Sequence, residues 1–563
     1  MTLHAAVESR SAAPAARSAA KVLVDQLKIQ GVTHVFCVPG ESYLAVLDAL
    51  YESDIAVTVC RNEGGASMMA EAYGKQTGRP GICLVTRGPG ATNASGGIHI
   101  AAQDSTPMIL FIGQIERENR GRDAFQEMDY RAFFGGLAKW VAEIDEPDRM
   151  AEMVGRAFST ALAGRQGPVV LSLPHDMLPL PSKSQDGTRI EPVETAPAAS
   201  DMAALESLLH KAKRPFLILG GNRWTRAALT QMADFAQAFG IPVATSFRRA
   251  HHIDPLHPNY AGDLGLAANP KLVARVKASD LVIAAGARLN ELTSQGYTLF
   301  DIPVPQMTLV HAYPDAEELG RVYQPHLAIH AAPQAFAAAL AKLQPRKTHD
   351  VTAEHRAYLD WSETGTRQPG AVNLSQIMIW LRGHLPADAI LCNGAGNYAG
   401  WIHRFYRFHQ FNTQIGTVCG FMGYGVPAAV AMKRLYPRRS VLALNGDGDF
   451  LMNGQEFATA IQYGLPIICI VFDNAMLGTI RMHQEREYPG RVSATSLRNP
   501  DFAAMARSFG GFGATVEKTE DFAAAFVAAE NSGLPAIIHV KFDGDGISPT
   551  TTLTAIRNKA LGA

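Results

Sequence analysis

The sequence predicts an α/β protein made of three doubly wound domains, each built on a parallel sheet. At 563 residues the chain is too long for one hydrophobic core and suits about two to four domains. Two polar joints, 179–200 and 343–372, divide it into three blocks. Within each block short apolar runs alternate with helical patterns, and this alternation is typical of strand–helix–strand units.

Each block contains four apolar runs that stop at glycine or a polar residue, as buried parallel strands do. They are HVFCV, GICLVT, MILFIG and PVVLSL in the first block, PFLILGG, PVATS, LVIAAG and MTLVHA in the second, and AILCNG, SVLALNG, IICIVFD and AIIHVKF in the third. Ligands of such sheets bind beyond the carboxyl ends of the strands. Functional residues are therefore expected where these runs stop.

Composition excludes several classes of protein. The formal net charge is −1, without the basic stripe that nucleic-acid binding requires. The six cysteines form no Cys-x-x-Cys pair, which indicates a reducing compartment without disulfides or a zinc site. No apolar run reaches the ~18 residues of a membrane helix. We therefore expect a cytoplasmic protein with no nucleic-acid or membrane partner; its first 18 residues are either a flexible tail or a transit peptide.

The most informative stretch runs from Leu442 to Ile480, where two apolar runs end in polar clusters. Gly446 and Gly448 allow a sharp turn and a close approach to a ligand, while Asp447 offers oxygens to a hard cation. Asn474 ends the next strand and offers an amide oxygen. Gly-Asp-Gly alone is often an ordinary turn. The strand–GDG–helix–strand–Asn order favours a metal-bridged diphosphate site.

This pattern resembles the signature of thiamine-diphosphate enzymes. The resemblance extends over about residues 19–545 and is strongest for the acetolactate synthase large subunit and its decarboxylase and carboligase relatives. It is carried by GVTHVFCVPGE, RNEGGASMMAEAYGKQTGRPGICLVTRGPGATN, GRDAFQE, GPVVLSLPHD and GFMGYGVPAA. It implies a pyrimidine-binding domain at 19–183, a central domain at 200–345, a diphosphate-binding domain at 370–545 and a C-terminal tail at 546–563.

The resemblance also implies roles for individual residues. It makes Asp447, Asn474 and the Met476 carbonyl the Mg²⁺ ligands, and Met422 an apolar prop under the thiazolium ring. Further residues expected to contact thiamine diphosphate are Pro39, Gly40, Asn93, Gly396, Asn397, Tyr398, Gly420, Gly446, Gly448 and Asp449.

Glu63 is the principal catalytic candidate. Taken alone, a glutamate before a helix more often interacts with the helix dipole. The resemblance instead implies a buried carboxylate of raised pKa that hydrogen-bonds the aminopyrimidine ring, promotes its imino tautomer and so activates the thiazolium. In the family this glutamate comes from a partner subunit. A homodimeric catalytic unit is therefore expected, within a homotetramer.

The implied reaction is carboligation through an enamine formed from a pyruvate-like 2-oxo acid, in an acetolactate-synthase-like enzyme with an altered acceptor pocket. The alternative is a non-oxidative 2-oxo acid decarboxylase or carbon–carbon lyase that releases an aldehyde. A non-enzymatic paralogue is disfavoured because Glu63, Asp447 and Asn474 are all present.

Departures from acetolactate synthase concentrate in the substrate pocket. His175 replaces a lysine, Leu292 an arginine and His483 a tryptophan. Loss of the guanidinium removes a carboxylate clamp, so an aldehyde acceptor is favoured over a second 2-oxo acid. Gln126 and His175 are catalytic candidates, and Phe125, Leu477 and His483 are expected to line the pocket.

Three weaker expectations complete the prediction. The resemblance leaves FAD in the central domain open, because the acetolactate synthase group carries a non-catalytic flavin there and many relatives have lost it. The pair His251–His252 is predicted to lie in a surface loop. The late Asp-Gly-Asp-Gly at 543–546 is predicted to be a simple turn.

Overall fold

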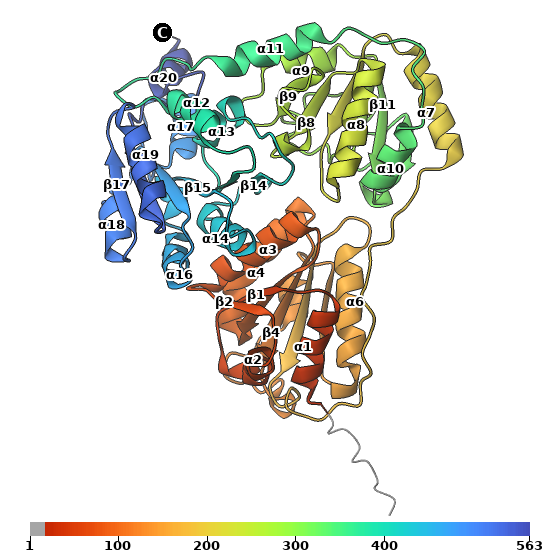
Figure 1. Cartoon of the computed structure of the whole chain (residues 1–563), viewed down its shortest axis with the longest axis vertical. Helices are drawn as coiled ribbons and strands as arrows, with labels where there is room; N and C mark the ends of the chain where they lie inside the picture. The colour runs from red at the N-terminus through yellow and green to blue at the C-terminus, as the bar shows by residue number, and fades with distance from the viewer. Residues whose placement is uncertain (1–16, 563) are drawn as a thin grey trace, which may run out of the picture.

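In the computed structural model, which describes residues 17–562, the chain folds around three sheets of six strands each. Every neighbouring pair of strands is parallel, which confirms the predicted fold class. Figure 1 shows the first domain below, in red and orange, and the central and third domains side by side above it.

The first domain runs from α1 to β6. Its strands are β1 (His34–Cys37), β2 (Ala56–Val59), β3 (Gly81–Thr86), β4 (Met108–Gln114), β5 (Trp140–Glu143) and β6 (Pro168–Pro174). Its helices are α1 (Ala19–Ile29), α2 (Leu44–Tyr51), α3 (Glu63–Thr77), α4 (Arg87–Asp104), α5 (Tyr130–Phe134) and α6 (Met150–Leu162). Residues 182–198 then run to the central domain without helix or strand (Figure 1).

The central domain has the strands β7 (Pro215–Leu219), β8 (Val243–Ser246), β9 (Tyr260–Leu264), β10 (Leu281–Ala285), β11 (Thr308–Tyr313) and β12 (Leu327–His330). Its helices are α7 (Ala199–Lys211), α8 (Arg226–Phe239), α9 (Pro270–Lys277), α10 (Pro333–Leu340) and α11 (Thr352–Glu363). Helix α11 lies within the second polar joint, where no regular pattern was expected. It buries Tyr358 against β9, so this joint is partly a structured element of the central domain.

The third domain has the strands β13 (Ile390–Asn393), β14 (Gln414–Gly416), β15 (Val441–Gly446), β16 (Ile468–Asp473), β17 (Phe512–Val516) and β18 (Ala536–Lys541). Its helices are α12 (Leu374–His384), α13 (Ala399–Phe405), α14 (Gly425–Leu435), α15 (Asp447–Phe450), α16 (Phe457–Gln462), α17 (Gly478–Glu487), α18 (Phe502–Ser508), α19 (Asp521–Ser532) and α20 (Leu553–Leu561).

The strand order shows where ligands are expected to bind. The first sheet has the order β2-β1-β3-β4-β6-β5, and the third repeats it as β14-β13-β15-β16-β18-β17. The central sheet has the different order β12-β11-β10-β7-β8-β9. The chain direction across the sheet reverses between β1 and β3, between β7 and β10, and between β13 and β15. Crevices at the carboxyl ends of such strand pairs are the usual binding sites of this architecture.

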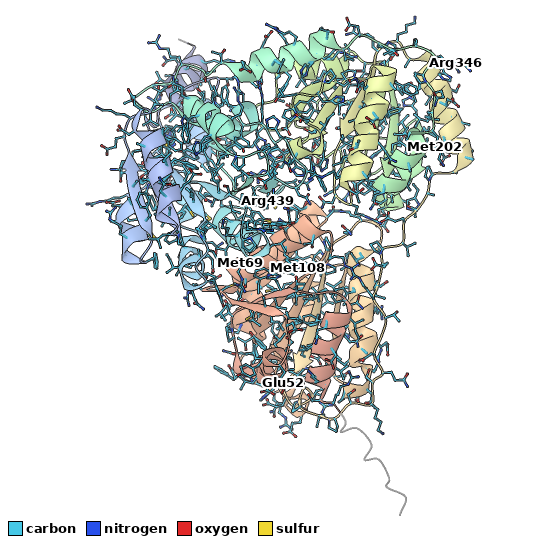
Figure 2. All side chains as sticks on the ribbon, viewed as in Figure 1. Glu52, Met69, Met108, Met202, Arg346 and Arg439 are labelled. Atoms are coloured by element: carbon cyan, nitrogen blue, oxygen red, sulfur yellow. The ribbon has the colours of Figure 1, made fainter. Side chains whose placement is uncertain are left out.

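Side chains of the first sheet alternate between its two faces. Ile82 and Leu84 of β3 pack into one core, while Cys83 and Val85 pack into another that continues into the third domain through Tyr424. This shared core is the reason that α3 and α14 lie side by side in Figure 1. Figure 2 labels Met69 and Met108, which belong to the first-domain side of this core.

A buried ionic network reinforces the contact between the first and third domains. Lys75 Nζ lies 2.6 Å from Asp104 Oδ2 and 3.2 Å from Glu71 Oε1, and it donates to the carbonyl of Gly416 at 2.9 Å. Glu71 also accepts a hydrogen bond from the Tyr424 hydroxyl at 2.6 Å. The cation therefore holds two buried carboxylates of the first domain against the backbone of the third.

Several local expectations have outcomes in the structure. The prediction that His251 and His252 lie in a surface loop is wrong: both are buried, 7% and 4% exposed, because Phe411 and Trp224 cover their rings. The Asp-Gly-Asp-Gly at 543–546 is a turn, as predicted.

The two ends of the chain were predicted to be tails. Most of the predicted N-terminal tail lies outside the described residues, and its last residues, Arg17 and Ser18, contact Asp25 and Pro181. The predicted C-terminal tail carries α20, whose Arg557 pairs with Glu485 of α17 at 2.6 Å. Within residues 17–562, no helix combines the length and apolar character that crossing a bilayer requires.

We expect Lys75→Met to lower the free energy of unfolding by about 3–5 kcal/mol, because it leaves Glu71 and Asp104 buried without a counter-charge. Denaturant titration followed by circular dichroism measures this loss. Lys28→Met, at an exposed position of α1, is the matched control and should change stability little. A loss below about 1 kcal/mol at Lys75 would show that the network does not hold the two domains together.

Candidate active site

The candidate site forms at the carboxyl edge of the third sheet, at the switch point between β13 and β15. The segment 394–398 leaves β13 there, and Gly446 to Asp449 leave β15 beside it. Both segments need glycine where they meet: a Cβ at Gly394 would lie 2.1 Å from Asp449 Oδ1. The sequence thus allows two backbone turns to approach more closely than side chains would permit.

Asp449 joins the loops of this edge. Its carboxylate accepts hydrogen bonds from the Gly423 amide at 2.7 Å, the Tyr398 hydroxyl at 2.8 Å, the Asn445 amide group at 2.9 Å and the Ala395 amide at 3.3 Å. The side chain is 2% exposed, and burial raises the pKa of this carboxyl despite these hydrogen bonds. Asp449 therefore holds the loops of the candidate site together through its hydrogen bonds.

Asp447 stands beside a second carboxylate. Asn499 Nδ2 donates to Asp447 Oδ2 at 2.7 Å and to Asp473 Oδ1 at 2.8 Å, and so bridges the two. Burial, together with the nearby Asp473, raises the pKa of Asp447 to about 6, although the hydrogen bond from Asn499 opposes the rise. A cation bound here would remove this cost, because it favours the ionised carboxylate.

The loop that contains Asn474 and Met476 is held in an unusual conformation. Ala475 has a φ of 55°, and the Leu477 and Leu497 amides donate to the Thr495 and Ala475 carbonyls, both at 2.8 Å. Neither bond uses the Met476 carbonyl. Among residues 17–562, no three His, Cys, Asp or Glu side chains converge as a metal site. A cation at this edge would therefore depend on one carboxylate together with amide and main-chain oxygens, which suit Mg²⁺.

Apolar side chains cover the same edge. A Cβ at Gly448 would lie 2.8 Å from Leu477 and 3.9 Å from Met422, so these two side chains converge over the Gly-Asp-Gly turn. Gly420 and Gly423, with φ of 69° and 83°, shape the loop that carries Met422. Asn397 accepts a hydrogen bond from the Thr479 hydroxyl at 2.9 Å, which ties segment 394–398 to α17.

Glu63 lies in the first domain as the first residue of α3, after its N-cap Asn62. Its Oε2 accepts a hydrogen bond from Asn93 Nδ2 at 2.9 Å. In this single chain Glu63 is half-buried rather than buried as expected. Within residues 17–562, no hydrogen bond joins it to the third domain. The Glu63–Asn93 pair and the third-domain cluster are therefore two separate groups of candidate residues.

Other first-domain candidates lie at the carboxyl edge of the first sheet. Gly40 follows β1 at the switch point, where a Cβ would lie 2.3 Å from Thr86; its neighbour Pro39 is exposed. Gln126 has a φ of 67°, and its carbonyl accepts a hydrogen bond from Gly88 at 3.1 Å. Phe125 is 75% exposed.

The two candidate histidines lie apart from the third-domain cluster or at its margin. His175 Nδ1 lies 3.4 Å from Glu116 Oε1 in the first domain. His483 is exposed on α17. Neither histidine therefore belongs to the cluster that Met422 and Leu477 cover.

Comparison with known proteins identifies the family. The model for the N-terminal binding domain of thiamine pyrophosphate enzymes matches residues 17–133, that for the central domain matches 202–340, and that for the C-terminal binding domain matches 394–540. The chain belongs to the thiamine pyrophosphate enzyme family.

Two of the similar proteins are large subunits of acetolactate synthase. The chain is 32% identical over 531 residues to the large subunit of acetolactate synthase isozyme 2 of Escherichia coli (strain K12), covering 93% of this chain and 95% of the relative. It is 33% identical over 557 residues to an acetolactate synthase large subunit of Corynebacterium glutamicum, covering 95% and 88% respectively. This thiamine pyrophosphate enzyme is thus acetolactate synthase-like.

Sequence reasoning missed several residues around the thiamine pyrophosphate enzyme's third-domain site. Asn499 lies in an irregular loop, and His539 Nε2 of β18 donates to Asp473 Oδ2 at 2.8 Å. Arg248 comes from the central domain and donates to the Gly394 carbonyl at 2.6 Å. No periodicity or motif marks these residues, because each acts through a tertiary contact.

We expect Asp449→Asn to lower the free energy of unfolding of the third domain by about 2–4 kcal/mol. The asparagine NH₂ group replaces one carboxylate oxygen, so at least one of the four donors that now bind Asp449 would face another donor. Thermal unfolding and thiamine diphosphate titration measure the two consequences, lower stability and weaker binding. Asp521→Asn, at an exposed position of α19, serves as the control. Unchanged stability in Asp449→Asn would show that the loops assemble without this carboxylate.

Proposed function

We propose that this protein is a thiamine-diphosphate-dependent carboligase that joins a pyruvate-like 2-oxo acid to a neutral aldehyde. The observation that carries the proposal is the convergence of Asp447, the Asn474 loop and segment 394–398 at the switch point of the third sheet. Bound thiamine diphosphate supplies the electron sink that decarboxylation of a 2-oxo acid requires.

The residues of this edge suit that cofactor. Asp447, Asn474 and the Met476 carbonyl would hold Mg²⁺ against the diphosphate, while Gly396, Asn397 and Tyr398 would contact the diphosphate itself. Met422 and Leu477, which converge over Gly448, would form an apolar wall that keeps water from the reacting carbon. Asp449 would hold these groups at fixed positions.

The complete site would use two subunits. Glu63 and Asn93 lie at the edge of the first domain, and Phe125 exposes a large apolar surface on the same domain. We propose that a second copy covers this edge, so that Glu63 of one subunit reaches the aminopyrimidine held by the other. The homodimer is then the catalytic unit, and a homotetramer its expected assembly.

The acceptor preference follows from charges near the site. Leu292 stands where acetolactate synthases carry an arginine. Arg288 donates to the Gln103 carbonyl at 2.8 Å and pairs with Glu318, and Arg481 pairs with Glu485 at 3.2 Å. Both neighbouring arginines are therefore engaged elsewhere. An acceptor carboxylate would lose its hydration without gaining a bidentate partner, whereas an aldehyde has no such cost.

The loops at the switch point of the central sheet leave too little space for a flavin. At the switch point between β7 and β10 a Cβ on Gly221 would lie 1.8 Å from the Gly286 carbonyl oxygen, so the two loops are in contact. The cavity beside them that Arg249, Arg288 and Tyr313 line measures ≈ 30 Å³, and the other cavity that reaches Gly221 measures ≈ 210 Å³. A cofactor pocket usually needs about 300 Å³ or more. We therefore propose an enzyme without FAD.

We expect the aldehyde to prevail when pyruvate is the donor and acetaldehyde and 2-oxobutyrate compete as acceptors at equal concentration. The aldehyde product should exceed the acetohydroxy acid by about tenfold or more, since an unpaired acceptor carboxylate costs at least ~1.4 kcal/mol. Chromatography of the products measures the ratio, and Leu292→Arg should shift it toward the 2-oxo acid.

Two results would contradict this acceptor preference. Dominance of the acetohydroxy acid would restore an ordinary acetolactate synthase. Release of free aldehyde from pyruvate without any coupled product would support the decarboxylase or lyase alternative.

We expect Asp447→Ala to weaken Mg²⁺-dependent thiamine diphosphate binding by about a hundredfold, because a charged metal ligand is lost. The stability of the folded protein should not fall. The folded-state pKa of Asp447 is raised, to about 6, so its ionised form opposes folding above that pH and its removal costs no stability near neutrality. Calorimetric titration and thermal unfolding test both halves, with Asp521→Ala as control. Tight binding by Asp447→Ala would remove the proposed metal site.

We expect Glu63→Gln and Asp447→Ala to be inactive separately but to regain about a quarter of wild-type activity after co-refolding or subunit exchange. Half of the randomly mixed dimers contain both variants, and each of those has one intact site of two. The measurement is specific activity against mixing ratio. Lack of complementation in dimers shown by mass spectrometry to be mixed would place Glu63 and Asp447 in the same chain's site.

A further inference from the structure

A second cavity lies where all three domains meet, away from the carboxyl edge of the third sheet. Its volume is ≈ 210 Å³. Its walls come from the end of α3, the loop after β7, residues 249–252 and residues 411–415. Since a water molecule takes about 30 Å³, the cavity has room for about seven waters or a molecule of similar size.

The side chains that line this cavity are cationic. Lys75, Arg223 and Arg249 belong to its wall, and no carboxylate does. Lys75 and Arg223 have acidic partners behind the wall, in Asp104 and Glu194. Arg249 is different: it is 5% exposed and donates only to neutral oxygens, the carbonyls of Gly221 and Arg248 and the side chain of Asn222. Burial lowers the pKa of Arg249, whereas Asp104 and Glu71 favour its charged form and raise the pKa against that effect, but neither carboxylate forms a salt bridge with it. An anion in the cavity would therefore be its direct charged partner.

Several buried polar atoms of the same wall have no hydrogen-bond partner within the described chain. They are His251 Nδ1, His252 Nδ1, Gln414 Nε2, Arg223 Nε and Gln76 Oε1. Burial lowers the pKa of both imidazoles, that of His251 to about 3, so each is neutral and can donate one N–H. Buried polar groups are almost always satisfied, so this concentration of them points to a partner.

We propose that this three-domain cavity is a binding site for one small carboxylate anion. The Gln414 amide and the Arg223 Nε–H are unpartnered donors, each neutral imidazole adds one N–H on Nδ1 or Nε2, and Gln76 Oε1 is an unpartnered acceptor. Carboxylate oxygens accept several such bonds at once and would complement Arg249. The rings of Trp224 and Phe411 cover the apolar part of the ligand. A dicarboxylate of about seven non-hydrogen atoms, such as malonate, has the size of the cavity.

The position of this cavity connects it to the candidate active site. Gln414 Oε1 accepts a hydrogen bond from the Ala250 amide at 2.9 Å, and Gln414 begins β14, which leads to the loop carrying Met422. Arg248, next to Arg249, donates to Gly394 at 2.6 Å. An anion here would therefore act on both segments proposed to hold thiamine diphosphate, as an effector. This coupling rests on the proposed function, whereas the binding itself does not.

Calorimetric titration of the full-length protein with malonate tests the site. We expect one saturable site per chain, both in the protein as purified and with Mg²⁺ and thiamine diphosphate added. Gln414→Glu keeps the acceptor for Ala250 and places a carboxylate in the cavity, so malonate should bind at least about tenfold more weakly. Gln237→Glu, exposed on α8, is the matched control and should bind like the wild type.

A second variant keeps the test independent of that substitution. His252→Phe retains the ring and removes its donor, and it should also weaken malonate binding while leaving thermal stability near that of the wild type. Inorganic phosphate in place of malonate separates carboxylate recognition from general anion binding: equal affinity for both would overturn the carboxylate assignment. Absence of saturable malonate binding, or unchanged binding in both cavity variants, would show that the cavity holds only water.

Discussion

The candidate site depends on one buried carboxylate. Asp449 accepts four hydrogen bonds from groups on three separate stretches of chain, and each stretch carries residues proposed to contact the cofactor. Only Asn445 belongs to a strand, at the end of β15; the segments that carry Ala395, Tyr398 and Gly423 lie beyond the strands and are not held by the sheet ladder. Without an acceptor at this point, the four amide and hydroxyl donors would lose their partner in a buried place. The glycines of the loops follow from the same constraint, because the oxygens of Asp449 occupy the space that a Cβ of Gly394 would need.

Repetition of one topology explains why the proposed site spans two domains. The first and third sheets share a strand order, and so each has a switch point with a glycine turn, Gly40 in one and Gly394 in the other. In the proposed site the third domain would supply the oxygen ligands and the first would supply Glu63, so neither would be complete alone. Within one chain the two domains pack through α3, α14 and the Lys75 network, which fixes their relative position. A second copy then has a defined surface on which to complete the site.

The apolar runs of the sequence predicted the central strands of each sheet but not its edge strands. All twelve apolar runs became strands, and they are the four central strands of every sheet. The missed strands are the edge strands, β2 and β5, β9 and β12, and β14 and β17. An edge strand is less fully buried and mixes polar with apolar residues: β17 reads FGATV and is mostly half-exposed. Asp447 and Asn474 could be proposed from the sequence because glycine, carboxylate and amide stand at fixed positions after strands, whereas Asn499 and Arg248 act across tertiary contacts that leave no local pattern.

Residues that follow the strands of the central domain contact the other two domains. Contact between the loops at Gly221 and Gly286 closes its switch point, and the side chains of Arg248 and Arg249 are buried on the neighbouring edge. Arg248 donates to the Gly394 carbonyl of the third domain, and Arg249 lines the cavity that α3 of the first domain also lines. Arg249 reaches the first domain only indirectly: it donates to Asn222 Oδ1, and Asn222 in turn donates to the carbonyls of Asp104 and Ser105. Arg248 thereby links the central domain to the third, and Arg249 is the cation that would complement an anion in the cavity lined by all three domains.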